Sequence, residues 1–263
     1  LGVCTEILLR LIPLPEHIET VLANFPRAEH AASSVCSMFA GGIIPRAAEL
    51  MDEGAVECVR RYRASDSLPD EGVFCLFEVD GPRSVTVEEA ERVVGICREN
   101  GAASARRAAT EEEREEFWSL RRAISPALYK LGRVKLNEDI CVPRTRLAEM
   151  LERTGEISER HSLQIVNFGH IGDGSIHVNV MLEHDDEELY RKAEKAVAEV
   201  FAAAVSMGGT LSSEHGIGLT KAGFLNIEVA EKEIAVMARI KRALDPNGIL
   251  NPGKFIDALP SGP

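Results

Sequence analysis

The chain of 263 residues and 28.7 kDa carries 30 lysines and arginines against 42 aspartates and glutamates, which gives a formal net charge of −12. This acidic balance excludes a typical duplex-binding protein, because nucleic-acid phosphates are bound by clustered lysine and arginine. With 45% hydrophobic residues but no apolar run near the roughly 20 residues of a membrane helix, the composition predicts an ordinary folded core and no membrane span.

The predicted elements alternate between strands and helices. Strands are predicted where short apolar runs end at proline or glycine, and helices where apolar residues recur with helical spacing or follow a capping residue such as Thr86 or Thr110. In chain order, we expect a strand at residues 7–15, helices at 16–24 and 45–63, a strand at 72–79, helices at 86–101 and from 110, a helix from 143, two strands within 163–182, and helices at 186–207 and 230–244.

The two strands within residues 163–182 surround a turn sequence at 172–175, which is a hairpin signal. The alternation lacks the GxGxxG turn that is typical of a dinucleotide-binding parallel sheet. The sequence therefore predicts the α+β class, with an antiparallel sheet and helices on one face.

Six cysteines are scattered along the chain without a CxxC pair. Several of them lie among apolar neighbours, as in residues 72–77. This pattern favours buried, reduced thiols in a reducing compartment, and we expect the protein in the cytoplasm.

Two histidines flank the predicted turn of the hairpin. If residues 172–174 reverse the chain, His170 ends one strand and His177 begins the next, so both imidazoles lie at one end of the hairpin. The two-residue period of a strand puts Asn179 on the same face as His177. This arrangement is typical of a two-histidine metal site, although a lone histidine is more often a surface or hydrogen-bonded core residue.

Residues 210–218 offer a carboxylate, Glu214, beside a further histidine, His215. Two histidines and one carboxylate with open positions suit a divalent ion such as zinc, manganese or iron, and zinc is the favoured ion. Because neighbouring residues of an extended segment face opposite sides, we assign Glu214 as the third ligand and His215 as an acid or base.

Two further segments each allow two interpretations. Arg121 and Ser125 are four residues apart on one helix face, where the arginine either holds a carboxylate with two hydrogen bonds or lies on the surface. Residues 135–143 present polar side chains either from a strand or from a strand end followed by a helix cap.

Several motifs in a fixed order resemble the FAD-linked oxidases of the vanillyl-alcohol oxidase type. Residues 170–177 resemble the family segment HxGDGxxH, and residues 212–218 resemble SGEHGIG, with Ser213 where glycine is common. Residues 251–254 resemble the terminal NPGK, and residues 1–6 resemble the end of the flavin-binding domain. The likeness is to the C-terminal half of glycolate oxidase flavin subunits and of D-lactate and D-2-hydroxyglutarate dehydrogenases.

The resemblance implies an α+β cap domain, related to the ferredoxin-like fold, in an enzyme that oxidises a 2-hydroxy acid to the 2-oxo acid. The implied cofactors are FAD, bound mainly by a domain outside this chain, and a divalent metal that assists loss of the hydroxyl proton while a hydride passes to FAD. By motif position, the implied roles are metal ligand for His170, His177 and Glu214, catalytic base for His215, substrate contact for Arg121, Ser125 and Asn179, and cofactor contact for Asn251 and Lys254.

The resemblance also divides the chain into three parts. Residues 1–12 are expected to be the end of a missing FAD-binding domain, residues 13–244 the substrate- and metal-binding cap, and residues 245–263 a segment that returns toward the flavin. We therefore expect the chain alone to fold but to be inactive. The expected partners are a small 2-hydroxy acid and an FAD-binding domain supplied in cis or in trans, with a homodimer as a further candidate.

Two other functions use the same residues differently. One is a free-standing metalloenzyme, a hydrolase or a non-haem iron oxygenase, with a site of two histidines and one carboxylate. The other is a non-catalytic binding or dimerisation module with structural histidines and no metal. Asn137 stands where some family members have a lysine, which weakens the inference of a second acid group on the substrate. Glycolate, D-lactate and D-2-hydroxyglutarate all stay candidates.

Overall fold

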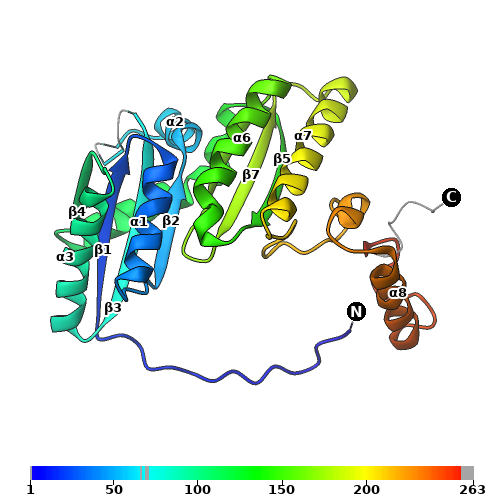
Figure 1. Ribbon diagram of the computed structural model, residues 1–263, viewed down its shortest axis with the longest axis horizontal. Coiled ribbons are helices and arrows are strands. Elements are labelled where there is room, and N and C mark those ends of the chain that lie inside the picture. Colours follow the sequence, from blue (N-terminus) through cyan, green and yellow to red (C-terminus); the bar gives the residue numbers. More distant parts are fainter. Residues whose placement is uncertain (1, 66, 69–70, 256–263) are drawn as a thin grey trace.

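A seven-stranded sheet lies at the centre of the molecule, with the strand order β4-β1-β3-β2-β6-β7-β5 and antiparallel neighbours throughout (Figure 1). The computed structural model describes residues 2–65, 67–68 and 71–255. The strands are β1 (His17–Phe25), β2 (Ala47–Met51), β3 (Val73–Gly81), β4 (Ser104–Arg107), β5 (Val134–Cys141), β6 (Gln164–His170) and β7 (Ser175–Leu182).

The helices lie between these strands and after them. The α-helices are α1 (Ala28–Ala40), α2 (Glu53–Tyr62), α3 (Arg83–Glu99), α4 (Glu111–Arg122), α5 (Ile124–Ala127), α6 (Leu147–His161), α7 (Glu187–Ser206) and α8 (Glu231–Leu244). Short 3-10 segments are η1 (Leu128–Lys130), η2 (Arg144–Arg146) and η3 (Ala222–Ile227). None of the helices in the described residues combines the length and the apolar character of a membrane span.

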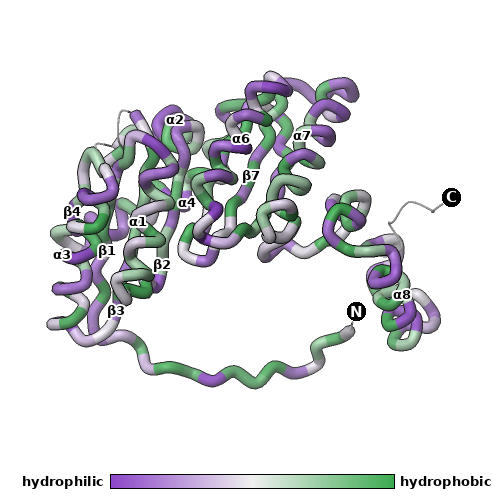
Figure 2. The backbone as a smooth tube through the Cα atoms, viewed as in Figure 1, coloured by the Kyte–Doolittle hydropathy of each residue, from purple (hydrophilic) through white to green (hydrophobic). Residues whose placement is uncertain are grey.

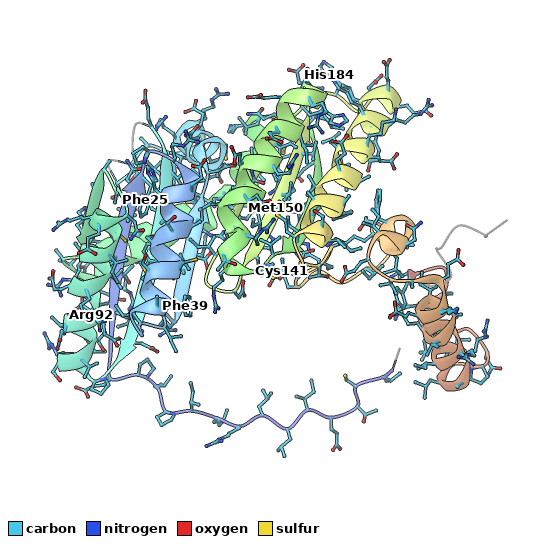
Figure 3. All side chains as sticks on the ribbon, viewed as in Figure 1. Phe25, Phe39, Arg92, Cys141, Met150 and His184 are labelled. Atoms are coloured by element: carbon cyan, nitrogen blue, oxygen red, sulfur yellow. The ribbon has the colours of Figure 1, made fainter. Side chains whose placement is uncertain are left out.

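Two hydrophobic layers enclose the sheet. Helices α1, α3, α6 and α7 pack on one face, while the shorter α2, α4 and α5 pack on the other. Phe25 of β1 and Met150 of α6 belong to the first layer and are fully buried (Figure 3). On β3, Phe77 faces the first layer and Leu76 the second, as the two-residue period of a strand requires. The predicted antiparallel α+β class is confirmed. The expectation of helices on one face only is corrected, because both faces of the sheet carry apolar side chains and the shorter helices cover the second face.

The first predicted elements differ from the structure. Residues 7–15 lack secondary structure and are largely exposed, because no strand of the described residues pairs with this apolar run. Residues 16–24 lie almost wholly in strand β1 rather than in a helix, since β1 pairs with both β3 and β4. Ile18, Thr20 and Val21 are β-branched, which favours the strand.

Residues 45–63 form a strand and a helix rather than one helix. Asp52 separates β2 from α2 as an N-cap, and its carboxylate accepts a hydrogen bond of 2.8 Å from the amide of Ala55. Helix α1 has no counterpart among the predicted elements. Its many alanines and serines give only a weak apolar period.

Most later elements agree with the prediction. Helix α4 follows Thr110 as its N-cap, and the β6–β7 hairpin, α7 and α8 lie where they are expected. Helix α3 begins at Arg83 rather than at Thr86, whose hydroxyl donates to the Pro82 carbonyl inside the first turn. The helix predicted from Pro143 opens with η2 before α6.

The two ends of the described chain lie side by side (Figure 1). Gly2 and Val3 line a cavity of about 140 Å³ together with residues of α8 and of the C-terminal segment. Helix α8 buries none of its side chains, and Leu8 is fully exposed. Exposed apolar residues are distributed along the N-terminal segment (Figure 2). The terminal segments therefore offer apolar surface that the sheet does not cover. Residues 256–263 of the predicted C-terminal part lie outside the described residues.

All six cysteines are free thiols. Cys58, Cys75 and Cys97 are buried, as predicted, and two others are partly buried. Cys4 is exposed, which corrects the expectation of a buried thiol, because the N-terminal segment there does not join the core.

One carboxyl group in this core should make stability depend on pH. Glu138 of β5 is buried, its Oε2 lacks a hydrogen-bond partner, and the Lys221 ammonium lies 4.0 Å away. Burial, opposed by the charge of Lys221, raises the pKa of Glu138 from 4.5 to about 7. The folded chain therefore holds this proton more tightly than the unfolded chain does. The resulting stabilisation is present below pH 4.5 and is lost as the pH rises toward 7.

We expect Glu138→Gln to remove this pH dependence, which amounts to about 3 kcal/mol of unfolding free energy between pH 4.5 and pH 7. Urea unfolding of both chains at several pH values measures it. Glu183→Gln is the control, because the Glu183 side chain is 83% exposed. Parallel stability curves for the wild type and Glu138→Gln would contradict the assignment.

Candidate metal centre

Three predicted ligands meet at the end of the β6–β7 hairpin. His170 ends β6, His177 lies early in β7, and Glu214 comes from the loop after α7. One ligand atom from each lies within 4.8 Å of the other two. Glu214 Oε1 is 3.4 Å from His177 Nε2 and 3.9 Å from His170 Nε2. The structure thus brings together two imidazoles and one carboxylate.

The hairpin turn brings the two histidines into one site. Gly174 has a φ of +93°, and a Cβ at this position would lie 2.0 Å from the Val142 carbonyl oxygen. Only glycine therefore lets the turn close against the end of β5. Phe168 is the direct partner of His177 across the ladder, and the His170 and His177 rings meet edge to face at 5.4 Å.

The two histidines differ in their proton affinity. A hydrogen bond of 2.6 Å between His170 Nδ1 and Glu49 Oε1 raises the pKa of His170. Burial, followed by the charges of His170 and Arg121, lowers the pKa of His177 to about 4. His177 is therefore neutral at pH 7, and an imidazole nitrogen with a free lone pair can bind a metal.

Glu49 forms hydrogen bonds to two residues of the site, His170 and Arg121. Its carboxylate is buried, with Oε1 on His170 and Oε2 accepting a hydrogen bond of 2.8 Å from Arg121 Nε. The Arg121 guanidinium also lies 4.9 Å from the centre of the Phe168 ring. A carboxylate on the outer nitrogen of a metal-binding histidine fixes the ring and raises its basicity.

His215 lies beside the three predicted ligands. Its ring stacks on that of His177 with centroids 5.4 Å apart and an interplanar angle of 18°. Its Nδ1 is 3.4 Å from Asp139 Oδ1. Burial raises the pKa of Asp139, but the hydrogen bonds from Lys221 and from the loop amides outweigh it and bring this pKa to about 2. Asp139 is therefore an anion at neutral pH.

Asn179 and Ser125 occupy different surroundings. Asn179 is buried on the His177 face of β7, and its amide nitrogen donates to the carbonyls of Val166 and His177, each at 3.3 Å. Its Oδ1 lacks a hydrogen-bond partner. Ser125 is exposed in α5 and accepts a hydrogen bond of 3.2 Å from Lys135 Nζ. Burial lowers the pKa of Lys135.

The structure does not bring Asn251 and Lys254 to the histidines. Both line the small cavity beside α8, with Gly2 and Val3. Figure 1 shows α8 apart from the seven-stranded sheet. Any part they play toward a flavin therefore belongs to the surface formed by the two chain ends.

Sequence reasoning missed Glu49 and Asp139. Glu49 is the only acid in residues 47–51. Because a helix is predicted there, the sequence does not place Glu49 on the buried face of a strand. Asp139 lies in residues 135–143, for which the sequence allows either a strand or a strand end followed by a helix cap. The structure shows the strand, β5. An acid within a short apolar run is the signal for Glu49, whereas Asp139 has polar neighbours in β5.

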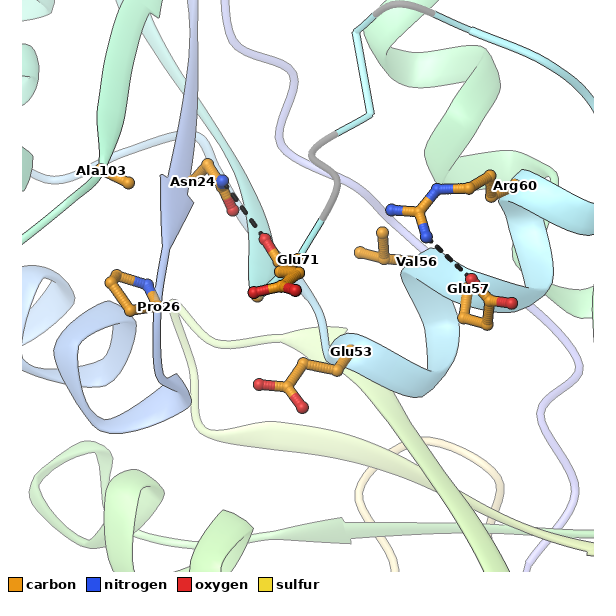
Figure 4. Close-up of a pocket in the computed structure, with 9 residues that line it drawn as sticks. Asn24, Pro26, Glu53, Val56, Glu57, Arg60, Glu71 and Ala103 are labelled. Atoms are coloured by element: carbon orange, nitrogen blue, oxygen red, sulfur yellow. Dashed lines mark hydrogen bonds and ion pairs between the residues drawn. The ribbon is translucent and has the colours of Figure 1, made fainter.

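A second cavity, of about 500 Å³, lies away from the histidines (Figure 4). It is lined by residues that include Asn24, Glu53, Glu57, Arg60 and Glu71. Asn24 donates to the Glu71 carbonyl at 3.4 Å, and Arg60 pairs with Glu57 at 2.8 Å. The described residues that line this cavity include neither histidine nor cysteine, so they offer no soft metal donor.

The donor set of the hairpin site fits a divalent metal ion. Two imidazole nitrogens and one carboxylate oxygen leave coordination positions for substrate or water. If His170 is a zinc ligand as predicted, we expect Glu49→Gln to weaken zinc binding roughly 10- to 100-fold, because the ring loses the carboxylate bonded to its Nδ1. A chelator competition titration measures this. The matched control is Glu78→Gln, a buried glutamate of β3 bonded to Thr20 and Trp118. Equal zinc affinities in the two variants would contradict the role of Glu49.

The sequence matches the family described as "FAD linked oxidases, C-terminal domain" over residues 14–255. The glycolate oxidase subunit GlcD of Bacillus subtilis is 34% identical over 256 residues, which cover 97% of this chain and 54% of that protein. The mitochondrial D-lactate dehydrogenase [cytochrome] of Arabidopsis thaliana is 33% identical over 258 residues, which cover 97% of this chain and 45% of that protein. The chain spans about half the length of the curated relatives it matches.

Two solved structures resemble the fold. A p-cresol methylhydroxylase with substrate bound superposes with a TM-score of 0.69 and 12% identity, covering 94% of this chain and 54% of that one. The 4-ethylphenol oxidase from Gulosibacter chungangensis gives a TM-score of 0.65 and 17% identity, covering 96% of this chain and 56% of that one. At these identities the likeness concerns the fold alone.

Proposed function

The chain belongs to the C-terminal domain family of the FAD-linked oxidases, and from this premise we propose that it is the substrate- and metal-binding part of an enzyme that oxidises a 2-hydroxy acid to the 2-oxo acid. One observation carries the proposal: the ligand atoms of His170, His177 and Glu214 lie within 4.8 Å of one another, with the His215 ring stacked on His177. Relatives named as glycolate oxidase and D-lactate dehydrogenase support a small 2-hydroxy acid as the substrate.

The residues fit the chemistry of hydroxyl deprotonation. His170, His177 and Glu214 would hold a divalent ion, for which zinc is favoured and manganese or iron also suit; when bound, the ion lowers the pKa of a coordinated hydroxyl. His215 turns Nδ1 toward Asp139, so its Nε2 is the nitrogen that takes the hydroxyl proton. A carboxylate beside Nδ1 favours a proton on that nitrogen and leaves Nε2 as the acceptor.

Arg121 is assigned to the substrate carboxylate. Its Nε is bonded to Glu49, and its terminal nitrogens have no hydrogen bond to the described residues, so they can donate in parallel to a carboxylate. Asn179 offers an unpaired Oδ1 on the face of His177, which suits a donor group of the substrate. Ser125 is assigned to the same substrate, at the side where it meets Lys135.

FAD is the hydride acceptor in this proposal, and a separate FAD-binding domain binds most of it. We assign residues 1–12 to the junction with that domain, residues 13–244 to the cap and residues 245–263 to a segment that returns to the flavin. The exposed N-terminal segment and the unburied α8 support this, because apolar surface of this kind is normally covered by a partner. Asn251 and Lys254 lie there as the proposed flavin contacts.

Six free cysteines, three of them buried, support a reducing compartment, and we propose the cytoplasm as the location. Purification without reductant followed by thiol titration tests the redox part of this proposal. Rapid loss of the exposed Cys4 thiol alone would agree with it.

We expect the isolated chain to fold yet to remain colourless after incubation with FAD and gel filtration. We also expect no turnover of glycolate or D-lactate, because the hydride acceptor is not held. Visible absorption of the protein peak and a dye-reduction assay measure the two properties. A yellow chain that oxidises either acid would contradict the division of labour between the domains.

A further inference from the structure

We propose that Asp139 is a positioning residue for the metal ligand Glu214 and the base His215. Its carboxylate accepts hydrogen bonds from the backbone of their loop and is paired with Lys221. The roles of Glu214 and His215 rest on the proposed function. The anchoring itself rests on contacts of the structure alone.

Three consecutive backbone amides converge on one oxygen of Asp139. Oδ2 accepts hydrogen bonds from the amides of Ser213 at 2.9 Å, Glu214 at 2.6 Å and His215 at 3.0 Å. The side chain is completely buried. Successive amides that point to one centre form a concave anion site, so a carboxylate satisfies them all where a neutral acceptor would satisfy them less well.

The other oxygen of Asp139, Oδ1, contacts two further side chains, Lys221 and Ser212. Asp139 Oδ1 is bonded to the Lys221 ammonium, and it accepts a hydrogen bond of 3.3 Å from the Ser212 hydroxyl. Lys221 is buried as well and donates to the backbone carbonyls of Asp139 at 2.9 Å and Leu211 at 3.0 Å. All three ammonium protons therefore have acceptors, and the lysine joins β5 to the start of the loop.

Besides Asp139, two hydroxyl contacts fix the loop next to the site, namely Ser213 Oγ with Ser175 Oγ at 2.5 Å and Ser212 Oγ, which donates to the Gly216 carbonyl at 3.2 Å. Residues 212–216 form no helix or strand, and Gly216 has a left-handed φ of +72°. The Glu214 side chain is 54% exposed, so packing does not orient it. Asp139, by contrast, lies on β5 directly opposite His177 in the ladder. An anchor at this position holds the loop above the histidine that Glu214 must meet.

The test uses the full chain with Zn²⁺ alone as the probe. The main variant is Asp139→Asn combined with Lys221→Met, because removing both charges avoids leaving one ion buried without a partner. The control is Lys221→Met alone, which keeps the three amide hydrogen bonds to Oδ2. For each chain we would measure zinc affinity by chelator competition, the melting temperature without metal, and hydrogen exchange of residues 213–215.

We expect the double variant to bind zinc at least roughly tenfold more weakly, with faster amide exchange at residues 213–215. We expect the control to stay within about threefold of the wild type in zinc affinity. It should melt below the double variant, because its Asp139 carboxylate stays buried without the lysine. Unchanged zinc affinity in the double variant would overturn the proposal. Equal losses of zinc affinity in both variants would do the same, because they would assign Asp139 to general stability.

Exchange in the wild type decides the matter even if the double variant does not fold. Slow exchange of the three amides supports the anchor, and exchange at the rate of a free loop overturns it. If the wild type shows slow exchange but binds no zinc, the proposed function fails while the anchoring stands. The two failures are therefore distinguishable.

Discussion

The chain should take up about one equivalent of zinc, and His177→Ala should abolish this uptake. His177 is a proposed ligand, and its pKa, lowered to about 4, leaves the ring neutral at pH 7 with a nitrogen lone pair available for a metal. Its Nε2 is also the nearer of the two imidazole atoms to Glu214. Removing it leaves two donors, which is too few for a stable protein zinc site. Elemental analysis after loading with zinc, manganese or iron and removal of excess metal measures the stoichiometry.

His184→Ala is the control for this loss. The His184 side chain is 71% exposed and lies far from the hairpin turn (Figure 3). We expect this variant to keep its zinc, because among the described residues His184 belongs to no group that could hold a metal ion. Retention of one equivalent by His177→Ala would locate the ion outside the hairpin site and would remove the main support for the proposed mechanism.

Replacing His215 by Gln should lower kcat of the flavin-loaded enzyme roughly 10²- to 10⁴-fold, the range expected when a general base is removed. Zinc content should stay unchanged, because His215 stacks on a ligand rather than joining the ligand atoms. Steady-state oxidation of a 2-hydroxy acid, together with metal analysis of the same preparation, separates catalysis from metal binding.

His161→Gln is the matched control for that variant. His161 ends α6 and pairs with Glu199 of α7 at 2.8 Å, away from the three ligands. Its replacement should leave kcat nearly unchanged. A His215→Gln enzyme with the turnover of the His161→Gln enzyme would show that another group takes the proton.

The part of the site built by local sequence could be predicted. His170 and His177 are separated by one tight turn, so hairpin geometry alone brings them together. The glycines of residues 172–174 predict that turn. Glu214 followed from the ligand needs of the two histidines rather than from any contact that the sequence displays.

The part built by long-range pairing could not be predicted. Glu49 reaches His170 because β2 lies next to β6, and this pairing joins segments 121 residues apart. Asp139 likewise depends on distant residues, because its carboxylate accepts hydrogen bonds from amides 74 to 76 residues later in the chain. Hydrophobic periodicity reports which face of an element is buried, but it does not report the neighbouring strand.

The error at β1 has a related cause. Residues 16–24 contain apolar residues at spacings that fit a helix as well as a strand, and short runs of this kind are ambiguous. The sheet decides, since β1 has a strand on each side. Helix α4 escapes this ambiguity because Thr110 caps it and three glutamates fill its first turn.

Anaerobic reduction of the flavin by a 2-hydroxy acid, in the flavin-loaded enzyme that contains this chain, is the decisive measurement for the proposed metal-assisted oxidation. We expect D-lactate or glycolate to bleach the flavin when zinc is bound, and His177→Ala or removal of the metal to slow bleaching by orders of magnitude. Bleaching at the wild-type rate in the metal-free His177→Ala enzyme would contradict this mechanism.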